Sequence, residues 1–219
     1  MGPMERKERE RLALRRKILD AARSLFAEQG YEAVTMRTIA NEVEYSPRTL
    51  YLHFKDKEEL IRELCQEDFR VLGEGFGQLM AIPDPLDRLR ASGMAYAEFA
   101  QAFPNHYQLM FMTAKPVHEE PANVAWFGNP EADAYAFVRS CVQEAQAKGL
   151  LRPGWEDSDL TAQVVWGALH GVLALHVTHR DDPFVPWRDL QARVESVIRM
   201  IQDGLRAEPP PKTRSTRKA

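Results

Sequence analysis

A chain of 219 residues is long enough to bury one sizeable hydrophobic core, or one large and one small domain. Its hydrophobic content of 44% and charged content of 28% are ordinary for a soluble globular protein, and a net charge of −3 excludes a polycation. Residues 1–56 contain 11 Lys and Arg against 9 Asp and Glu, whereas residues 57–219 contain 18 against 23. A slightly basic head on an acidic body fits a DNA-binding head whose body stays off the DNA.

The cysteines, the N-terminus and the longest apolar run indicate in which cellular compartment the protein is expected. Cys65 and Cys141 provide neither a disulfide framework nor metal-ligand spacing, so we expect both to be reduced and close to the core. The N-terminus is charged and lacks the apolar stretch of a signal peptide. The longest apolar run, 162–177, is shorter than a membrane span and contains Gln163, His170 and His176. These features predict a cytoplasmic protein without a membrane segment.

Charged residues crowd the first 15 positions, and two interpretations stay open. This segment is either a solvated helical extension or an N-terminal arm that touches DNA phosphates. A regular apolar stripe then predicts an amphipathic helix over 12–29, which Gly30 ends.

Two capping residues divide the next stretch into two short helices. Thr35 is a good N-cap for a helix over 36–43. Ser46 is a second N-cap, and Pro47 takes the first helical position, where its missing N–H costs nothing. The second helix is expected to end at about His53. Helix, roughly three-residue turn and helix together predict a helix-turn-helix, the DNA-binding motif whose second helix enters the major groove.

The segment TMRTIANEVEYSPRTLYLHFKDKEEL, residues 35–60, resembles the DNA-binding signature of TetR-type transcriptional regulators. It departs from that pattern at Glu44–Tyr45, where a small-residue turn is usual, and at Arg48, where Gly is frequent. The residues that carry the resemblance are Gly30, Tyr31, Thr35, Ile39, Ala40, Val43, Ser46, Thr49, Leu50, Tyr51, His53, Phe54 and Lys55.

The expected DNA contacts follow from the length and polarity of the side chains. Arg48 can form a bidentate pair with guanine, Pro47 can contact a thymine methyl, and Thr49 can reach a base or a phosphate. The resemblance implies phosphate contacts for several others, against the plainer interpretation of solvated polar residues. The predicted DNA-binding set is Thr35, Arg37, Ser46, Pro47, Arg48, Thr49, Tyr51, His53, Lys55 and Lys57.

The rest of the chain reads as helices without a strand signal. Asp56 caps a helix over 57–80, in which Gly73, Gly75 and Gly77 are expected to mark a bend or fraying. Further helices are predicted over 85–103, 105–113, 131–148, 158–178 and 187–205, with a loop over 114–130. The fold class is therefore all-α with about nine helices. The expected domains are a DNA-binding three-helix head (1–56), a helical effector-binding and dimerisation body (57–206) and a disordered basic tail (207–219).

Aromatic and methionine residues are abundant in the body, which suits either an apolar pocket or a solid core. His170 is either a polar group of such a pocket or a hydrogen-bonded core histidine. HYQLMF at 106–111 and WGALHG at 166–171 resemble a TetR subgroup named for a Trp-His-Gly pattern, and the family resemblance implies an inducer domain that binds a small hydrophobic molecule. The predicted ligand-binding set is Phe99, Phe103, Tyr107, Met110, Phe111, Trp126, Tyr135, Trp166 and His170.

The resulting prediction is a dimeric repressor of transcription that a hydrophobic effector releases from double-stranded operator DNA. The candidate homodimer interface is the helix pair 158–178 and 187–205. No catalytic constellation, cofactor motif or convincing metal site is visible; His176 and His179 are more simply surface histidines. The alternatives are an effector-independent architectural DNA-binding dimer, a helical enzyme with an appended head, and activation in place of repression.

Overall fold

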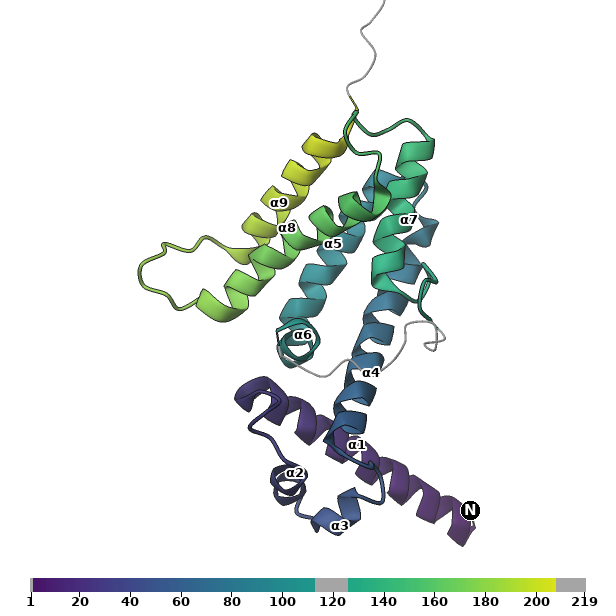
Figure 1. Ribbon diagram of the computed structural model, residues 1–219, viewed down its shortest axis with the longest axis vertical. Helices are drawn as coiled ribbons and strands as arrows, with labels where there is room; N and C mark the ends of the chain where they lie inside the picture. The colour runs from purple at the N-terminus through teal and green to yellow at the C-terminus, as the bar shows by residue number, and fades with distance from the viewer. Residues whose placement is uncertain (1, 113–125, 208–219) are drawn as a thin grey trace, which may run out of the picture.

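The computed structural model describes residues 2–112 and 126–207. Nine α-helices and one short 3-10 helix make up this part of the chain, and the only strand-like pairing in it is an isolated antiparallel bridge between Leu151 and Arg206. The predicted all-α class is confirmed. Figure 1 shows a small head built on α1 to α3 below a larger helical body. The predicted loop over 114–130 and the predicted tail over 207–219 lie mostly outside the described residues.

The head consists of α1 (Pro3–Gln29), α2 (Met36–Glu42), α3 (Pro47–Leu50) and the start of α4 (Lys57–Gly77). The caps form as predicted: Thr35 accepts a hydrogen bond from the Thr38 N–H at 3.1 Å, Ser46 from the Thr49 N–H at 3.2 Å, and Asp56 from the Glu59 N–H at 2.7 Å. These caps fix where each helix of the head begins.

Two helices of the head, α1 and α3, differ in length from the prediction. The first helix begins at Pro3 instead of residue 12, so the charged segment is helical and its side chains are largely exposed. The recognition helix α3 ends at Leu50 instead of His53, because the chain changes to i→i+3 bonding there: the His53 N–H donates to the Leu50 carbonyl at 2.8 Å.

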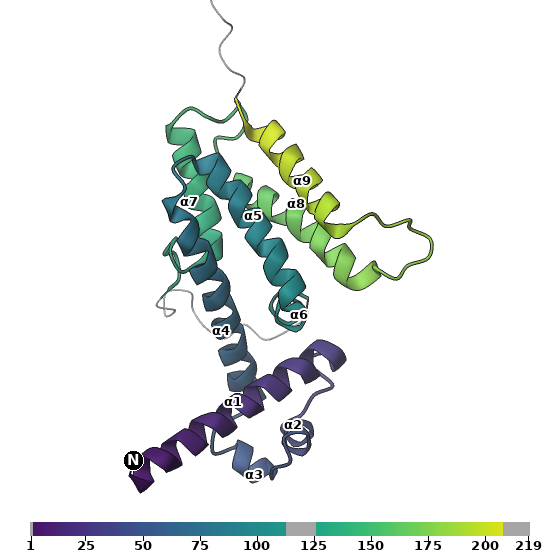
Figure 2. The same ribbon diagram turned by 180° about the vertical axis from the view of Figure 1, so that it is seen from behind.

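The body contains η1 (Gln78–Ala81), α5 (Pro85–Ala102), α6 (Pro104–Phe111), α7 (Ala134–Ala147), α8 (Ser158–His179) and α9 (Leu190–Leu205). Figures 1 and 2 both show α4 leaving the head and continuing into the body, where it packs beside α7. One helix therefore belongs to the head at one end and to the body at the other.

The glycines of α4 have a packing role in place of the expected bend or fraying, because the α-helix continues through Gly77. A Cβ on Gly73 would lie 1.9 Å from the Ala132 carbonyl oxygen, and one on Gly77 would lie 2.4 Å from the Glu131 carbonyl oxygen. Gly75 faces open space. Gly73 and Gly77 thus let the segment before α7 lie directly on α4.

Helix α6 connects the body to the head. Its Leu109 is fully buried in the core of the head, together with Ile18, Phe26 and Ile39. The Gln108 amide donates to the carbonyl of Ala27 at the end of α1. The head is therefore packed against the body through α6 as well as through α4.

One face of α8 and α9 is apolar and unusually exposed. Leu160, Val164, Trp166 and Leu175 of α8 and Met200 of α9 are all exposed. Helix α8 has 22 residues and contains an 18-residue stretch with a mean hydropathy of 1.4, so it extends beyond the apolar run 162–177 and by length and composition alone could cross a membrane. Weak burial of so apolar a helix indicates a face that needs a partner.

Candidate DNA-binding surface and body cavity

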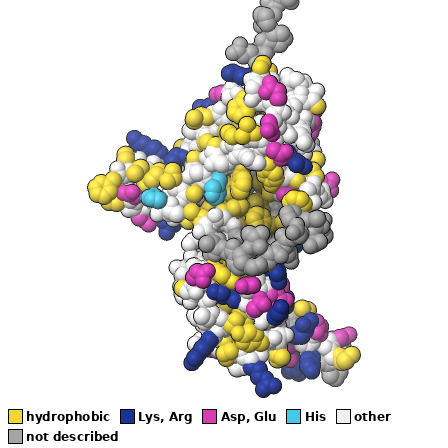
Figure 3. Space-filling model, viewed as in Figure 1, with side chains coloured by type: hydrophobic (Ala, Val, Ile, Leu, Met, Phe, Trp, Pro, Cys, Tyr) yellow, Lys and Arg dark blue, Asp and Glu magenta, His cyan; other side chains and the backbone are white. Residues whose placement is uncertain are grey.

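The predicted DNA-contacting residues belong to α2 and α3 with their N-cap residues, the segment after α3 and the first residue of α4, and α2 and α3 form the lower end of the head in Figure 1. Figure 3 shows Lys and Arg side chains along this lower edge. Among the ten residues, three are half-buried, namely Thr49, His53 and Lys57, and the other seven are exposed.

Arg37 and Arg48 are fully available for a partner. Both are exposed, and neither side chain makes a hydrogen bond or an ion pair within the described part of the chain. Ser46 and Thr49, by contrast, are engaged with each other: their hydroxyl oxygens lie 2.9 Å apart while Ser46 caps α3. The arginines are therefore free for base edges or phosphates, and the hydroxyls first of all fix the helix start.

His53 lies three residues after the end of α3 and contacts α1 through its carbonyl. Arg15 of α1 donates to the His53 carbonyl and places its guanidinium 4.1 Å from the centre of the Phe54 ring. The His53 Nδ1 is buried without a hydrogen-bond partner among the described residues. Burial, helped by the positive charges of Arg15 and Arg11, lowers the pKa of His53 below its ordinary value. The imidazole is therefore neutral at neutral pH.

Lys57 already has partners inside the protein. Its ammonium donates to the carbonyls of Tyr31 and Val34 at 2.8 and 2.9 Å, and it lies 3.9 Å from the centre of the Tyr31 ring. An ammonium has three N–H donors, so one remains for a phosphate. Its first role is to hold the start of α4 against the turn that follows α1.

The turn between α2 and α3 contains the sequence departure at Glu44. Glu44 adopts a φ of 62°, the left-handed region that L residues other than Asn and Asp rarely occupy.

The exposed apolar side chain of Leu52, 77% accessible, lies two residues after α3 and was missed by sequence reasoning. Its position between Tyr51 and His53, two predicted DNA contacts, was the sequence feature that could have pointed to Leu52.

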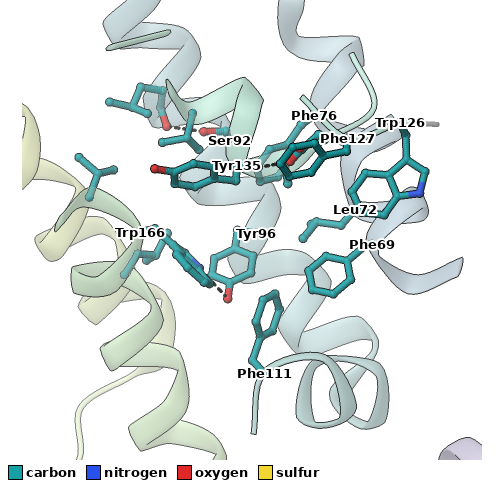
Figure 4. A pocket seen from close by; sticks show the side chains of 17 residues that line it. Phe69, Leu72, Phe76, Ser92, Tyr96, Phe111, Trp126, Phe127, Tyr135 and Trp166 are labelled. Carbon is teal, nitrogen blue, oxygen red and sulfur yellow. Dashed lines mark hydrogen bonds between the residues drawn. The ribbon is translucent and has the colours of Figure 1, made fainter. Parts of the chain in front are cut away.

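A cavity of about 250 Å³ opens in the body between α4, α5, α7 and α8 (Figure 4). Four of the predicted ligand-binding residues line it: Phe111, Trp126, Tyr135 and Trp166. Trp126 also stacks on Phe69, with ring centres 6.3 Å apart. In the space-filling view a hollowed hydrophobic region occupies this part of the body (Figure 3).

The other five predicted residues do not line the cavity. Phe99 and Phe103 pack with the His106 ring on another side of α5 and α6, and Met110 is buried in the body core. The Tyr107 hydroxyl lies 2.8 Å from His170 Nδ1, which the Tyr96 hydroxyl also approaches. For these five, ligand binding stays a prediction, since composition identifies aromatic residues without saying which face of a helix remains unfilled.

The residues missed by the prediction are mainly on α4 and α5. Phe69, Leu72 and Phe76 of α4 line the cavity but were not among the predicted ligand-binding residues. The cavity is also lined by Leu89, Ser92, Gly93, Tyr96, Phe127, Asp133, Ala134, Val138, Val165 and Leu169.

A polar cluster closes one end of the cavity. The hydroxyls of Tyr96 and Tyr107 lie 3.0 and 2.8 Å from the same His170 nitrogen, Nδ1, and the Trp166 indole N–H donates to the Tyr96 oxygen at 3.4 Å. Burial lowers the pKa of His170, raises the pKa of Tyr96 to about 12, and raises the pKa of Tyr107 further. All these groups are thus uncharged at neutral pH, and His170 is half-buried and within hydrogen-bond distance of both tyrosines.

No cluster of three or more His, Cys, Asp or Glu side chains suited to a metal ion occurs in residues 2–112 and 126–207. His176 Nδ1 lies 3.3 Å from Arg193 Nη2, and the His179 ring contacts the Thr178 hydroxyl. Both histidines therefore have ordinary partners at the end of α8.

Two domain families match the chain, one over its head and one over its body. Bacterial regulatory proteins of the tetR family match residues 18–64, and the tetracyclin repressor-like C-terminal domain matches residues 89–204. The HTH-type transcriptional regulator UidR of Escherichia coli (strain K12) is 27% identical over 171 residues, which are 78% of this chain and 85% of UidR. The HTH-type transcriptional repressor Rv1474c of Mycobacterium tuberculosis is 36% identical over 86 residues, which are 35% of this chain and 46% of Rv1474c.

The fold also matches solved structures. A TetR family transcription regulator from Marinobacter aquaeolei superposes with a TM-score of 0.71 at 16% identity, covering 92% of this chain and 100% of that one. At this identity the likeness shows the fold alone. A helix-turn-helix head on an all-helical body defines a DNA-binding transcription regulator. The chain belongs to the TetR family, whose members named here are regulators of transcription and not enzymes.

Proposed function

We propose that this regulator is a homodimeric repressor that a small hydrophobic molecule releases from its operator. The observation that carries the proposal is the cavity, because three of its wall residues, Phe69, Leu72 and Phe76, stand on α4, whose first turn belongs to the DNA-binding head. A ligand in the cavity therefore acts on the helix that positions the head.

The proposed DNA contacts follow the exposure of the head. Arg48 reads a guanine, with Pro47 and Thr49 beside it, because Arg48 is exposed and, among the described residues, unpaired at the start of α3, the second helix of the helix-turn-helix. Phosphate contacts hold the register. The residues proposed for this role are Thr35, Arg37, Ser46, Tyr51, His53, Lys55 and the remaining donor of Lys57.

The proposed dimer forms through α8 and α9. A single head reads a short half-site, and two-fold recognition needs two heads about 34–36 Å apart or a multiple of that distance. The exposed apolar face of Leu160, Val164 and Leu175 supports this interface, since it would otherwise remain in water. Val194 of α9 is fully buried within the protomer and does not belong to the contact face.

Release is a two-state process. The ligand must bind the head spacing that does not fit the operator more tightly than the spacing that does, and the difference in binding free energy sets how far DNA affinity falls. The similarity to Rv1474c, a transcriptional repressor, supports repression. An effector-independent architectural dimer remains the alternative, and the cavity argues against it.

Three finer assignments complete the proposal. Trp166, His170 and Gly171 support the Trp-His-Gly subgroup, although the family that matches the body is the tetracyclin repressor-like C-terminal domain. Access to operator DNA requires a cytoplasmic location. Residues 1–56 act as the DNA-binding unit and 57–206 as the effector-binding and dimerisation unit.

Footprinting on the DNA that flanks the gene tests operator binding, with protection of a two-fold symmetric sequence as the expected result. Arg48→Ala should relax preference at one base pair in each half-site and cost about 1–3 kcal/mol of binding free energy. A uniform loss on all sequences would show that Arg48 contacts phosphate and not a base. Protection of a single, asymmetric site would contradict the dimer.

The dimer has its own test. Leu175→Glu places a charge on the exposed face of α8, and light scattering should then report a monomer. Leu12→Glu is the matched control, because Leu12 is equally exposed but lies on α1. A dimer that persists in Leu175→Glu would exclude this face as the interface.

A further inference from the structure

The charge on the cavity wall restricts what the cavity can hold. Asp133 is the one charged side chain among the described residues that line it. Its carboxylate already accepts hydrogen bonds from the N–H groups of Tyr135, Ala136 and Gly128 at 2.9, 3.2 and 2.9 Å, and the residue is buried. An anionic ligand would therefore meet a negative charge in an apolar space, where an uncompensated charge is costly.

The size of the cavity restricts the ligand further. An apolar protein cavity of about 150 Å³ holds benzene, whereas this one measures about 250 Å³. The aromatic rings of Phe69, Phe76 and Phe111 face it from different sides (Figure 4). A molecule of two fused rings, or one ring with a short substituent, fits this space.

One hydroxyl on the wall is able to bind a ligand without loss elsewhere. The phenols of Tyr96 and Tyr107 both approach His170 Nδ1. In the tautomer that carries its proton on Nε2, this nitrogen has a single lone pair and accepts one good hydrogen bond. Tyr107 is the closer of the two and is fully buried, whereas Tyr96 lines the cavity beside Trp166 and Phe111 (Figure 4). When Tyr107 holds Nδ1, the proton of Tyr96 is free for an acceptor in the cavity.

We propose that the ligand is an uncharged one- or two-ring molecule with one hydrogen-bond acceptor, such as a ketone oxygen, and that the Tyr96 hydroxyl donates to this acceptor. This inference rests on the proposed function, since it assigns the effector of the same cavity. It excludes free carboxylic acids, which are ionised at neutral pH, and it makes Tyr96 the residue that selects among ligands of equal shape.

Three probes of one skeleton test the proposal by calorimetry on the full chain: 2-acetylnaphthalene, 2-ethylnaphthalene and 2-naphthoate. The ketone should bind about 5- to 10-fold more tightly than the hydrocarbon, because it adds one hydrogen bond. The carboxylate should show no binding. Equal binding of 2-naphthoate and the ketone would overturn the uncharged class, and so would failure of all three probes to bind.

Tyr96→Phe should lower the affinity for the ketone to that for the hydrocarbon and leave the hydrocarbon unchanged. Retained hydrocarbon binding shows that the variant is folded. Tyr135→Phe is the matched control, because Tyr135 also lines the cavity while its hydroxyl donates to Asp159 at 3.0 Å. Undiminished ketone binding in Tyr96→Phe, or an equal loss in Tyr135→Phe, would remove Tyr96 from this role.

Operator binding separates this inference from the function on which it rests. If 2-acetylnaphthalene binds in the expected pattern but leaves the operator complex intact, the ligand class stands and release by the effector is wrong. If an anionic compound releases the operator while the neutral probes do not bind, release stands and the ligand class is wrong.

Discussion

Arg23 of α1 and Asp68 of α4 form an ion pair that is buried on both sides, with Arg23 Nη2 3.0 Å from Asp68 Oδ1 and side chains 7% and 1% exposed. The same carboxylate oxygen lies 2.8 Å from His106 Nδ1 of α6. The Asp68 carboxylate thus links three helices: α1 of the head, α4, which runs from the head into the body, and α6, which packs on the head. Its removal should affect how firmly the head is held.

Asp68→Ala should lower the free energy of unfolding by about 3 kcal/mol, because it leaves the Arg23 guanidinium buried without its main counter-charge. Asp20 and Glu67 remain close to Arg23 and keep the loss from being larger. Urea denaturation followed by circular dichroism measures the change. Glu74→Ala, which breaks the exposed pair with Arg70, should change stability by less than about 1 kcal/mol. An equal loss of unfolding free energy in Asp68→Ala and Glu74→Ala would show that the buried ion pair does not stabilise the protein more than the exposed one.

Substitution by alanine should have opposite effects on stability at Gly73 and Gly75, which lie about half a turn apart on α4. Gly73→Ala places a Cβ against the backbone carbonyl of Ala132, and a backbone carbonyl cannot move aside by a change of rotamer. We therefore expect destabilisation of about 1–3 kcal/mol. Gly75→Ala meets open space and should stabilise the helix by up to about 1 kcal/mol. Thermal unfolding of both variants checks the pair, and a stabilised Gly73→Ala would show that α4 and the segment before α7 are not in close contact.

Local chemistry explains why the head was predictable from the sequence. Thr35, Ser46 and Asp56 each cap the helix that was assigned to them, because an N-cap depends on neighbouring backbone N–H groups and not on the rest of the fold. The end of α3 was less predictable: nothing in Tyr51 or Leu52 forbids another helical turn. The partners of Lys57 were also hidden, because Tyr31 and Val34 are distant in sequence.

The cavity could not be located from the sequence for a related reason. Phe69, Leu72 and Phe76 have the same helical spacing whether their stripe meets another helix or an empty space. Phe99 and Phe103 carry the same type of ring, yet they pack together away from the cavity. Which stripe stays unfilled depends on how α4, α5, α7 and α8 diverge, and that is a property of the assembled body.

Glu44→Gly should stabilise the protein by about 1 kcal/mol. Glu44 holds a φ of 62°, a conformation that costs an L residue about 1–2 kcal/mol and costs glycine little, although glycine loses more entropy on folding. Thermal denaturation measures the change. Glu44→Ala separates the two effects of the substitution, because alanine removes the charge but keeps the Cβ. If Glu44→Ala stabilises the protein as much as Glu44→Gly, the gain comes from the charge and not from the backbone.

Protonation of His53 should couple to DNA binding. Burial and the charges of Arg15 and Arg11 lower the pKa of His53 in the free protein, and a DNA phosphate beside the ring would raise it again in the complex. Binding then takes up a proton. Affinity should be constant above the pKa of the complex, rise as the pH falls between the two pKa values, and level off below the pKa of the free protein.

Operator affinity at fixed ionic strength, from about pH 8 to about pH 5.5, measures this coupling across the range in which histidines titrate. His53→Gln keeps a hydrogen-bond donor but cannot ionise, so the rise in affinity attributable to His53 should disappear while binding at the upper end of the range persists. The other histidines are common to both proteins, and the difference between the two curves isolates His53. Parallel curves would mean that no phosphate lies against this ring.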